Sequence, residues 1–204
     1  KRSLKAAFYS AIQDDCIRKN PFDFHINTVI EDDTEPKIPL SPMQEESLIS
    51  FVKSDKVYYK YYDELIILRG TGLRISEFCG LMDSDIDFEN RTINVDHQLQ
   101  YSGKKSYRIE IPKTENGIRK IPMSDRVLEA LQRVLQNRKN SNFTVDGYTG
   151  FLFLTRSGIP KICTSYDAMF RRLVEKYNKS HEEALPAVTT PHTLRHTFCT
   201  NMAN

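Results

Sequence analysis

The sequence predicts an α+β fold that is mostly helical and carries a small antiparallel sheet of three strands. Most of the chain places apolar residues at the spacing of three and four that an amphipathic helix requires. Three short segments instead alternate apolar and polar residues as strands do, at residues 92–99, 107–111 and 118–122. Hydrophobic residues make up 39% of the chain and charged residues 27%, which is typical of a globular protein.

The predicted helices carry capping or stop signals at their ends. A first helix over residues 1–19 is expected to stop at Asn20-Pro21, because proline disfavours helical backbone in the residue before it. Ser41-Pro42-Met43-Gln44 has a capping-box pattern with proline at the first helical position. Further helices are expected at about residues 57–68, 73–80, 124–139, 165–179 and from residue 190 to the end.

An acidic, proline-containing stretch predicts the domain organisation. Residues 22–40 contain Pro36, Pro39 and the run Glu31-Asp32-Asp33, which favours an exposed linker. We therefore expect residues 1–21 to be the end of one domain and residues 41–204 to be a second domain. Because the chain begins and ends inside predicted helices, we expect it to be a fragment at both ends.

Composition argues against several classes of protein. No apolar run approaches the roughly 20 residues that a membrane helix needs, and no signal-peptide pattern opens the chain. The four cysteines lie far apart without a CxxC pair, which argues against a zinc ribbon and favours reduced thiols. The net charge is only +2, so charge alone does not predict a nucleic-acid partner.

The first candidate patch is Gly70-Thr71-Gly72-Leu73-Arg74-Ile75-Ser76-Glu77. Its glycines permit a tight turn, and Arg74 and Glu77 lie three residues apart on one helix face. Taken alone, the pair is better interpreted as an ordinary surface ion pair worth under about 1 kcal/mol. A dinucleotide-binding GxGxxG loop is excluded, because residue 75 is isoleucine.

The second patch is the turn Pro112-Lys113-Thr114-Glu115-Asn116-Gly117 between two predicted strands. Taken alone, Lys113 is an ordinary solvated lysine on a hairpin. Basic residues outnumber acidic ones around it, which suits contact with phosphates. These predicted phosphate-binding residues are Lys104, Lys105, Arg108, Arg119 and Lys120.

The third patch is Pro191-His192-Thr193-Leu194-Arg195-His196 at the start of the last helix. His192, Arg195 and His196 have helical spacing and project to one side, where the helix N-terminus favours an anion. We interpret His192 and Arg195 as phosphate contacts and His196 as a buried, hydrogen-bonded structural residue. A zinc site at His192 and His196 is the alternative, although Thr193 stands where HExxH has its glutamate.

In this order, GLRxSE, a hairpin lysine and HxLRH strongly resemble the tyrosine recombinase family, and the later HTLRHTFCTNMA is most similar to conjugative-transposon integrases. Residues 1–21 resemble the last helix of that family's core-binding domain, and residues 41–204 resemble its catalytic domain, truncated before the nucleophilic tyrosine. The resemblance implies that Arg74 and Arg195 clamp the scissile phosphate and that Glu77 braces Arg74. It implies that Lys113 is the general acid, that His192 contacts the phosphate and that His196 is structural.

The same resemblance implies site-specific integration and excision of a mobile element through a 3′-phosphotyrosyl intermediate, without a cofactor or a metal. No tyrosine follows His192 in this sequence. We therefore expect the nucleophile to lie beyond Asn204, so that this chain binds double-stranded DNA without cleaving it. The expected partners are a homo-oligomer, tetrameric in the family, and an excisionase accessory protein, in the cytoplasm of a bacterium at the nucleoid.

Three other functions remain open from the residues alone. A type IB topoisomerase uses a similar set of active-site residues but reseals the strand that it cut. A non-catalytic DNA-binding regulator derived from an integrase would also lack the nucleophilic tyrosine. A metalloenzyme at His192 and His196 is the third, and it is disfavoured by the missing glutamate.

Overall fold

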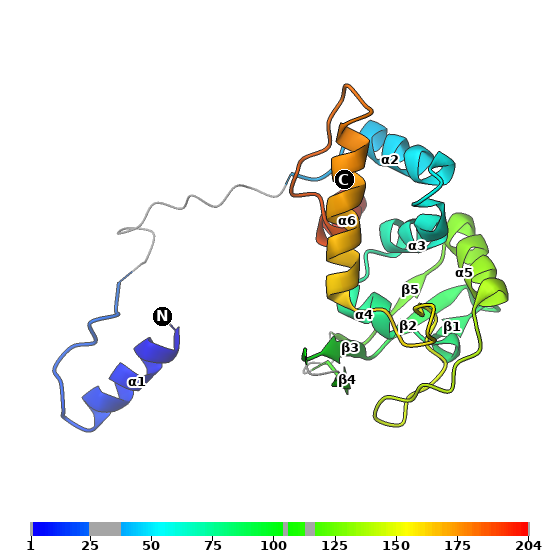
Figure 1. The fold of residues 1–204 in the computed structure, drawn as a ribbon. Coiled ribbons are helices and arrows are strands. Elements are labelled where there is room, and N and C mark those ends of the chain that lie inside the picture. Colours follow the sequence, from blue (N-terminus) through cyan, green and yellow to red (C-terminus); the bar gives the residue numbers. More distant parts are fainter. Residues whose placement is uncertain (1, 25–37, 104–105, 113–116, 204) are drawn as a thin grey trace. The chain divides into compact units, whose positions relative to one another are not determined.

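The structure is a computed structural model that describes residues 2–24, 38–103, 106–112 and 117–203 (Figure 1). The chain divides into two units, residues 1–36 and residues 37–204, and each unit is described separately. In the described part of the chain, no helix is both long enough and apolar enough to cross a membrane.

The helix of the first unit is shorter than predicted. Helix α1 spans Arg2–Gln13, and the backbone then turns through Asp15, which has a φ of 55°. Two consecutive aspartates follow the helix, where the negative end of its dipole disfavours carboxylates and where aspartate tolerates the left-handed conformation. The helix therefore ends before the predicted stop at residues 20–21.

Asn20 holds the returning segment against α1 instead of ending the helix. Its side-chain amide donates to the Lys5 carbonyl oxygen at 2.8 Å, and its side-chain oxygen accepts from the Phe22 amide at 3.0 Å. The rings of Phe8 and Phe22 lie 5.1 Å apart. These contacts close a small helix-and-return unit.

In the second unit, two helices begin at their predicted caps. Helix α2 spans Pro42–Ser54, and the Ser41 and Gln44 side chains form the predicted capping box. Helix α5 spans Asp125–Asn137 and begins after Ser124, whose hydroxyl accepts from the Val127 amide. Both starts confirm the sequence prediction, because a cap depends only on residues within one turn.

Helix α3, Tyr62–Thr71, is the central helix of the second unit and packs against α2, α5 and α7 (Figure 1). A 3-10 turn at Tyr59–Tyr61 precedes it, so α3 starts later than predicted and continues through Gly70. A Cβ at Gly70 would come within 2.4 Å of a Val127 methyl on α5, so this glycine permits the close approach of the two helices.

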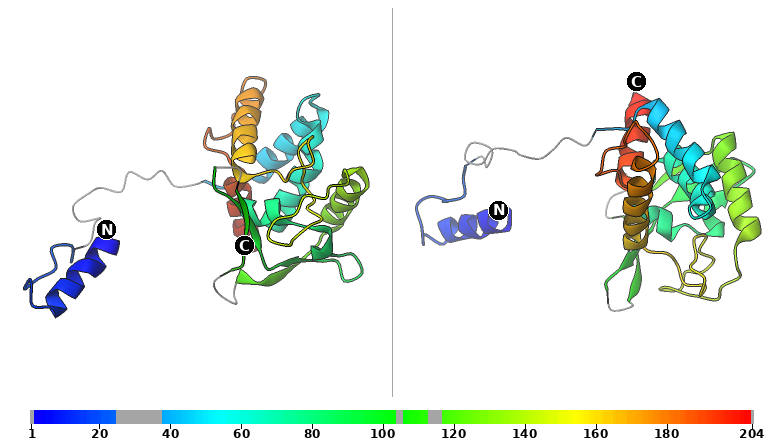
Figure 2. Two further views of the ribbon diagram at one scale, coloured as in Figure 1. Left: turned by 60° about the horizontal axis from the view of Figure 1, so that its bottom comes forward. Right: turned by 45° about the horizontal axis from the view of Figure 1, so that its top comes forward.

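The strands form two separate antiparallel sheets. Strands β1 (Ile86–Asp87), β2 (Thr92–Val95) and β5 (Arg119–Pro122) form a three-stranded sheet in the order β1-β2-β5. Strands β3 (Gln98–Tyr101) and β4 (Tyr107–Glu110) form a two-stranded hairpin that projects from the helices (Figure 2). A 3-10 turn at Asp83–Asp85 precedes β1.

The strand pairing differs from the sequence prediction in two respects. The segment predicted as one strand over residues 92–99 is divided between the two sheets. Among the described residues, β4 pairs with β3 and β5 pairs with β2, so the two strands predicted to flank a single turn belong to different sheets. An alternating pattern fixes which face of a strand is buried, but it does not identify the partner strand.

Helices α4, α6 and α7 complete the second unit. Helix α4 spans Ile75–Gly80, α6 spans Cys163–Asn178 and α7 spans Pro191–Ala203. Helix α6 packs against α4 and α7 and buries Tyr166, Phe170 and Tyr177 in the core. The mostly helical α+β class with a small antiparallel sheet is thus confirmed.

Candidate active site

The carboxylate of Glu77 is the centre of the candidate site. It accepts two hydrogen bonds from Arg74, from the backbone amide at 2.9 Å and from Nη1 at 2.8 Å. It accepts two more from the fork of Arg119, from Nη2 at 2.6 Å and Nη1 at 3.1 Å. Its side chain is only 7% exposed, so Arg74 and Glu77 do not form the ordinary surface pair that the first patch alone favoured.

The chain reaches this geometry through the turn between α3 and α4. Gly72 ends α3 in the left-handed conformation, with a φ of 59°. The buried Leu73 follows, and Arg74 has extended backbone immediately before α4. Glu77 is the third residue of α4, where a glutamate side chain reaches back to the backbone amide at the helix start. Local helix capping therefore sets the distance between Arg74 and Glu77.

Opposing effects determine the ionisation of Glu77. Burial acts to raise its pKa, whereas the hydrogen bonds from Arg119 and from the backbone and side chain of Arg74 lower it. The hydrogen bonds outweigh burial, and the net pKa lies below the ordinary glutamate value of 4.5. Glu77 is therefore a carboxylate at neutral pH.

Arg195 comes to this site from α7, far away in the sequence. Its Nη1 donates to the carbonyl oxygen of Gly72, in the turn that leads to Arg74. Burial lowers the pKa of Arg195, and the positive charge of Arg74 lowers it further. The guanidinium stays protonated at any physiological pH. Two guanidinium groups thus bind one carboxylate and a third lies near them, and the excess positive charge favours an anion.

The two histidines of the third patch both lie on the exposed face of α7. His192 lies in the first turn, and His196 lies one turn later. The prediction that His196 is buried is wrong, because α7 turns Thr193, Leu194 and Thr197 toward the core. The Thr200 hydroxyl lies 3.4 Å from Nδ1 of the His196 ring. Because two of these three buried residues are threonines, the sequence of α7 shows no distinctly apolar face that could have indicated this.

The remaining predicted residues have different positions. Lys104, Lys105 and Lys113 lie outside the described residues. Arg108 forms an exposed ion pair with Glu110 within the β3–β4 hairpin, and Lys120 is exposed on β5. Arg119 was predicted as a phosphate contact, and the structure places it on Glu77. Sequence reasoning missed this contact, because nothing local links residue 119 to residue 77.

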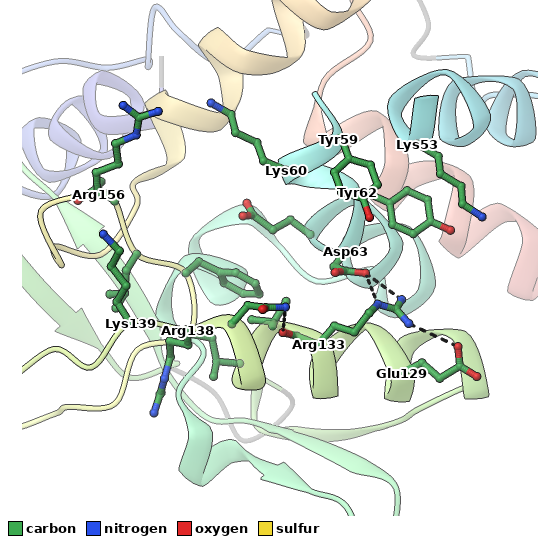
Figure 3. A pocket seen from close by; sticks show the side chains of 17 residues that line it. Lys53, Tyr59, Lys60, Tyr62, Asp63, Glu129, Arg133, Arg138, Lys139 and Arg156 are labelled. Carbon is green, nitrogen blue, oxygen red and sulfur yellow. Dashed lines mark hydrogen bonds and ion pairs between the residues drawn. The ribbon is translucent and has the colours of Figure 1, made fainter. Parts of the chain in front are cut away.

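A cavity of about 700 Å³ lies elsewhere on the second unit, between the start of α3, the end of α5 and residues 152–156 (Figure 3). Arg133 crosses it and forms ion pairs with Asp63 at 2.8 Å and Glu129 at 3.6 Å. Neither Arg74 nor Arg195 lines it. The candidate site is therefore separate from this cavity.

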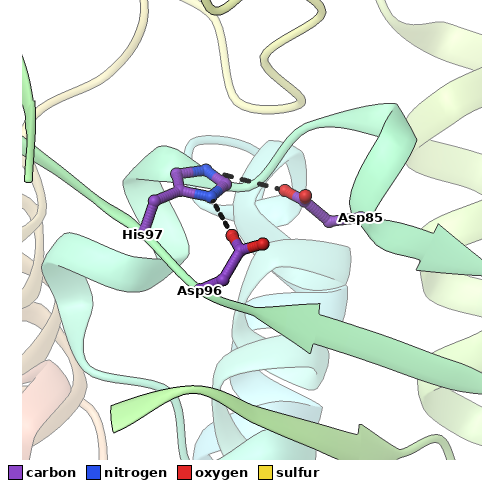
Figure 4. Close-up of side chains that lie close together, drawn as sticks. All are labelled: Asp85, Asp96 and His97. Atoms are coloured by element: carbon purple, nitrogen blue, oxygen red, sulfur yellow. Dashed lines mark hydrogen bonds and ion pairs between the residues drawn. The ribbon is translucent and has the colours of Figure 1, made fainter. Parts of the chain in front are cut away.

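Asp85, Asp96 and His97 form a cluster with the residue types of a metal site (Figure 4). Both ring nitrogens of His97 already have partners, since Nδ1 lies 2.6 Å from an Asp96 oxygen and Nε2 lies 2.9 Å from the Gly80 carbonyl oxygen. Asp85 accepts from the Met82 amide at 2.8 Å. We interpret the cluster as an anchor that ties the junction of β2 and β3 to the end of α4.

Comparison with known proteins agrees with this geometry. The model of the phage integrase family matches residues 39–204. The chain is 57% identical over 205 residues to the transposase from transposon Tn916 of Enterococcus faecalis. The match covers 100% of this chain and 50% of that protein. The transposase from transposon Tn1545 of Streptococcus pneumoniae gives the same identity and coverage. The chain spans about half the length of these curated relatives.

The integrase of transposon Tn1549, solved in complex with transposon right end DNA, has a similar structure. The TM-score is 0.95 at 63% identity, and the match covers 100% of this chain and 65% of that chain. The solved Tn1549 integrase carries a tyrosine-to-phenylalanine substitution. Because the family model spans most of the sequence and the Tn916 and Tn1545 relatives share more than half of its residues, this chain belongs to the phage integrase family of tyrosine recombinases.

Proposed function

We propose that the full-length protein containing this chain integrates and excises a mobile element by site-specific DNA strand exchange. The observation that carries the proposal is that Arg74, from the turn between α3 and α4, and Arg195, from α7, come together near the carboxylate of Glu77. The relatives named as transposon transposases, and the Tn1549 integrase solved with transposon DNA, support DNA of a transposon end as the substrate.

Arg74 and Arg195 suit a phosphodiester for electrostatic and geometric reasons. A guanidinium fork donates two parallel hydrogen bonds to phosphate oxygens and keeps its charge throughout the reaction. Charge that develops on those oxygens during phosphoryl transfer is therefore stabilised. A single well-placed arginine contributes about 10³- to 10⁵-fold to the rate of related reactions.

The proposed reaction has two balanced steps. A tyrosine hydroxyl attacks the phosphorus, a 3′-phosphotyrosyl bond forms, and the bond to the 5′ oxygen breaks. The 5′ hydroxyl of the other duplex then attacks the phosphotyrosine, which restores the phosphodiester and frees the tyrosine. Each step exchanges one phosphoester for another, so neither step needs ATP or water as a reactant.

We assign two further side chains to proton transfer and to phosphate binding. We assign Lys113 as the general acid that protonates the departing 5′ oxygen, a role typically worth about 10²- to 10⁴-fold. His192, one helical turn before Arg195, is assigned to the phosphate. Exchange between two duplexes breaks four strands in total, so we expect four protomers to assemble on the DNA.

The nucleophile must come from outside residues 1–204 in this proposal, because no tyrosine follows residue 192 here. A free phenol with a pKa of about 10 is only about one part in a thousand ionised at pH 7, so it depends on the arginines and a proton acceptor for activation. The chain of residues 1–204 would then bind DNA without cleaving it.

Covalent trapping on nicked duplex DNA from the ends of the host element tests the proposal. We expect a protein–DNA adduct from the full-length protein and none from residues 1–204 or from full-length Arg74→Ala. No adduct from the full-length protein, despite DNA binding, would indicate a non-catalytic DNA-binding regulator. An adduct followed only by resealing of the same strand would indicate a topoisomerase.

A further inference from the structure

We propose that Arg119 is a positioning residue, which holds Glu77 so that Arg74 remains available to the substrate phosphate. The proposal rests on the function proposed above and assigns Arg119 a role other than direct contact with phosphate. It follows from how Arg74 and Arg119 divide the oxygens of one buried carboxylate.

The two arginines bind Glu77 in different ways. Arg119 directs both terminal nitrogens of its fork to Glu77, one to each carboxylate oxygen. Arg74 contributes its backbone amide and a single terminal nitrogen. This contact aligns the end of the Arg119 fork with both oxygens of the carboxylate. Both terminal nitrogens of Arg119 are therefore engaged with Glu77, whereas only one terminal nitrogen of Arg74 is.

Exposure follows the same division. The Arg74 side chain is 56% exposed and the Arg119 side chain is 28% exposed, while Glu77 is buried beneath both. The ion pair with Arg119 compensates the buried negative charge of Glu77, which a carboxylate removed from water requires. The charge of Arg74 then remains available to attract an anion from solvent.

Arg119 also connects the site to a second part of the fold. It is the first residue of β5, and its Nη1 lies 3.4 Å from the Gly117 carbonyl oxygen on the same segment. Glu77 belongs to α4, and the register of β2 with β5 pairs Val95 with Arg119. Arg119 therefore ties the edge of the three-stranded sheet to the helix that presents Arg74.

Loss of the Arg119 fork should change the orientation of Arg74. Without it, both Glu77 oxygens would be open to the Arg74 guanidinium, which could close its own fork on the carboxylate. Arg74 would then present fewer donors to the phosphate and present them at a different angle. Small displacements of a positioned group can reduce a rate by about 100-fold.

The test uses Arg119→Lys in the full-length protein, because lysine keeps the charge and loses the fork. We expect the rate of cleavage at saturating DNA to fall about 10- to 100-fold. The affinity for DNA and its salt dependence should change less than about twofold. Arg126→Lys is the matched control, since Arg126 forms an exposed pair with Glu46 at 3.2 Å, and it should leave both quantities unchanged.

A double variant separates positioning from general structural damage. If Arg119 acts through Arg74, Arg119→Lys should slow an Arg74→Lys protein by less than about twofold, because the two substitutions then affect one interaction. Independent structural damage would multiply the two losses instead. A multiplied loss, or weaker binding and a shallower salt dependence at an unchanged cleavage rate, would overturn the proposal.

Two further measurements keep the result interpretable. If Arg119→Lys does not fold, Arg119→Gln combined with Glu77→Gln leaves no unpaired buried carboxylate. This pair should be as slow as Glu77→Gln alone, and a slower pair would contradict the proposal. If the wild-type protein forms no adduct, the function proposed above fails. The Arg119–Glu77 contact is then tested through protein stability. Because Arg119 lowers the pKa of Glu77, the unfolding free energy of Arg119→Lys should fall less steeply with decreasing pH than that of the wild-type protein.

Discussion

At the scale of single residues, the candidate site is a balance of charges around one buried carboxylate. The four hydrogen bonds from Arg74 and Arg119 hold the pKa of Glu77 below its ordinary value despite burial, and Arg195 adds a third positive charge nearby. The excess of guanidinium groups destabilises the folded protein when no anion is bound and attracts an anion to the site. Folding and the binding of an anion therefore both depend on the ion pairs of Glu77.

Glu77→Gln provides a test of this balance through pH. Because the folded-state pKa of Glu77 is lowered, its contribution to stability is present above the ordinary value of 4.5 and is lost as pH falls through the lower folded value. We expect the wild-type unfolding free energy to fall more steeply than that of Glu77→Gln below about pH 4.5. Denaturant unfolding between neutral and acidic pH measures the difference, and parallel curves would contradict the assignment.

The same variant should be less stable at neutral pH. Removing the carboxylate leaves Arg119 partly buried without its partner, and we expect the unfolding free energy to fall by roughly 3 kcal/mol. This value is at the low end for a broken buried ion pair, because the other partner, Arg74, is half exposed. Arg126→Gln removes one side of an exposed pair and is the matched control, with an expected change below about 1 kcal/mol.

At the scale of secondary-structure elements, the turn from α3 to α4 determines where the arginines lie. Gly72 ends α3 with a positive φ, accepts the hydrogen bond from Arg195 and precedes Arg74 by two residues. A Cβ at Gly72 would lie 2.2 Å from a ring carbon of Phe198 on α7. The same glycine thus satisfies a backbone requirement and a packing requirement.

Gly72→Ala and Gly103→Ala separate these two requirements. Both glycines have a φ near 60°, but nothing lies within 4 Å of a Cβ built at Gly103. We expect Gly103→Ala to cost about 1 kcal/mol from backbone strain alone. Gly72→Ala should cost about 2–5 kcal/mol, since overpacking against Phe198 adds to the strain. Urea unfolding of both variants measures this, and equal losses would show that Phe198 adjusts freely.

At the scale of the whole molecule, the chain combines a small net charge with a local concentration of positive charge. The sequence has a net charge of +2, yet two arginines bind a single carboxylate at the site and a third lies near them. The attraction to a polyanion therefore depends on how the fold distributes charge and not on composition.

We predict that DNA binding by residues 1–204 weakens steeply with salt. If only Arg74 and Arg195 contact phosphates, affinity for a mixed-sequence duplex should fall at least about 10-fold between about 50 and 200 mM salt. Arg195→Gln should reduce the slope of log affinity against log salt by about 0.9. Fluorescence anisotropy measures both quantities. An affinity that does not depend on salt would exclude the arginine clamp.

The sequence by itself determined the features that depend on neighbouring residues. The caps at Ser41 and Ser124, the order of the helices and the spacing of Arg74 with Glu77 all follow from contacts within one or two helical turns. The resemblance carried by the three patches identified the family. Helix ends shifted where competing local preferences were similar in strength, as at the end of α1.

Only the tertiary structure decided which strands pair, which face of α7 is buried and which residue neutralises Glu77. The chain passes from one sheet to the other at His97, and the alternating pattern continues across that change. His196 is exposed and Arg119 is bound to Glu77 because of contacts between residues far apart in the chain. Such contacts depend on how whole elements pack, and short-range sequence patterns do not encode that choice.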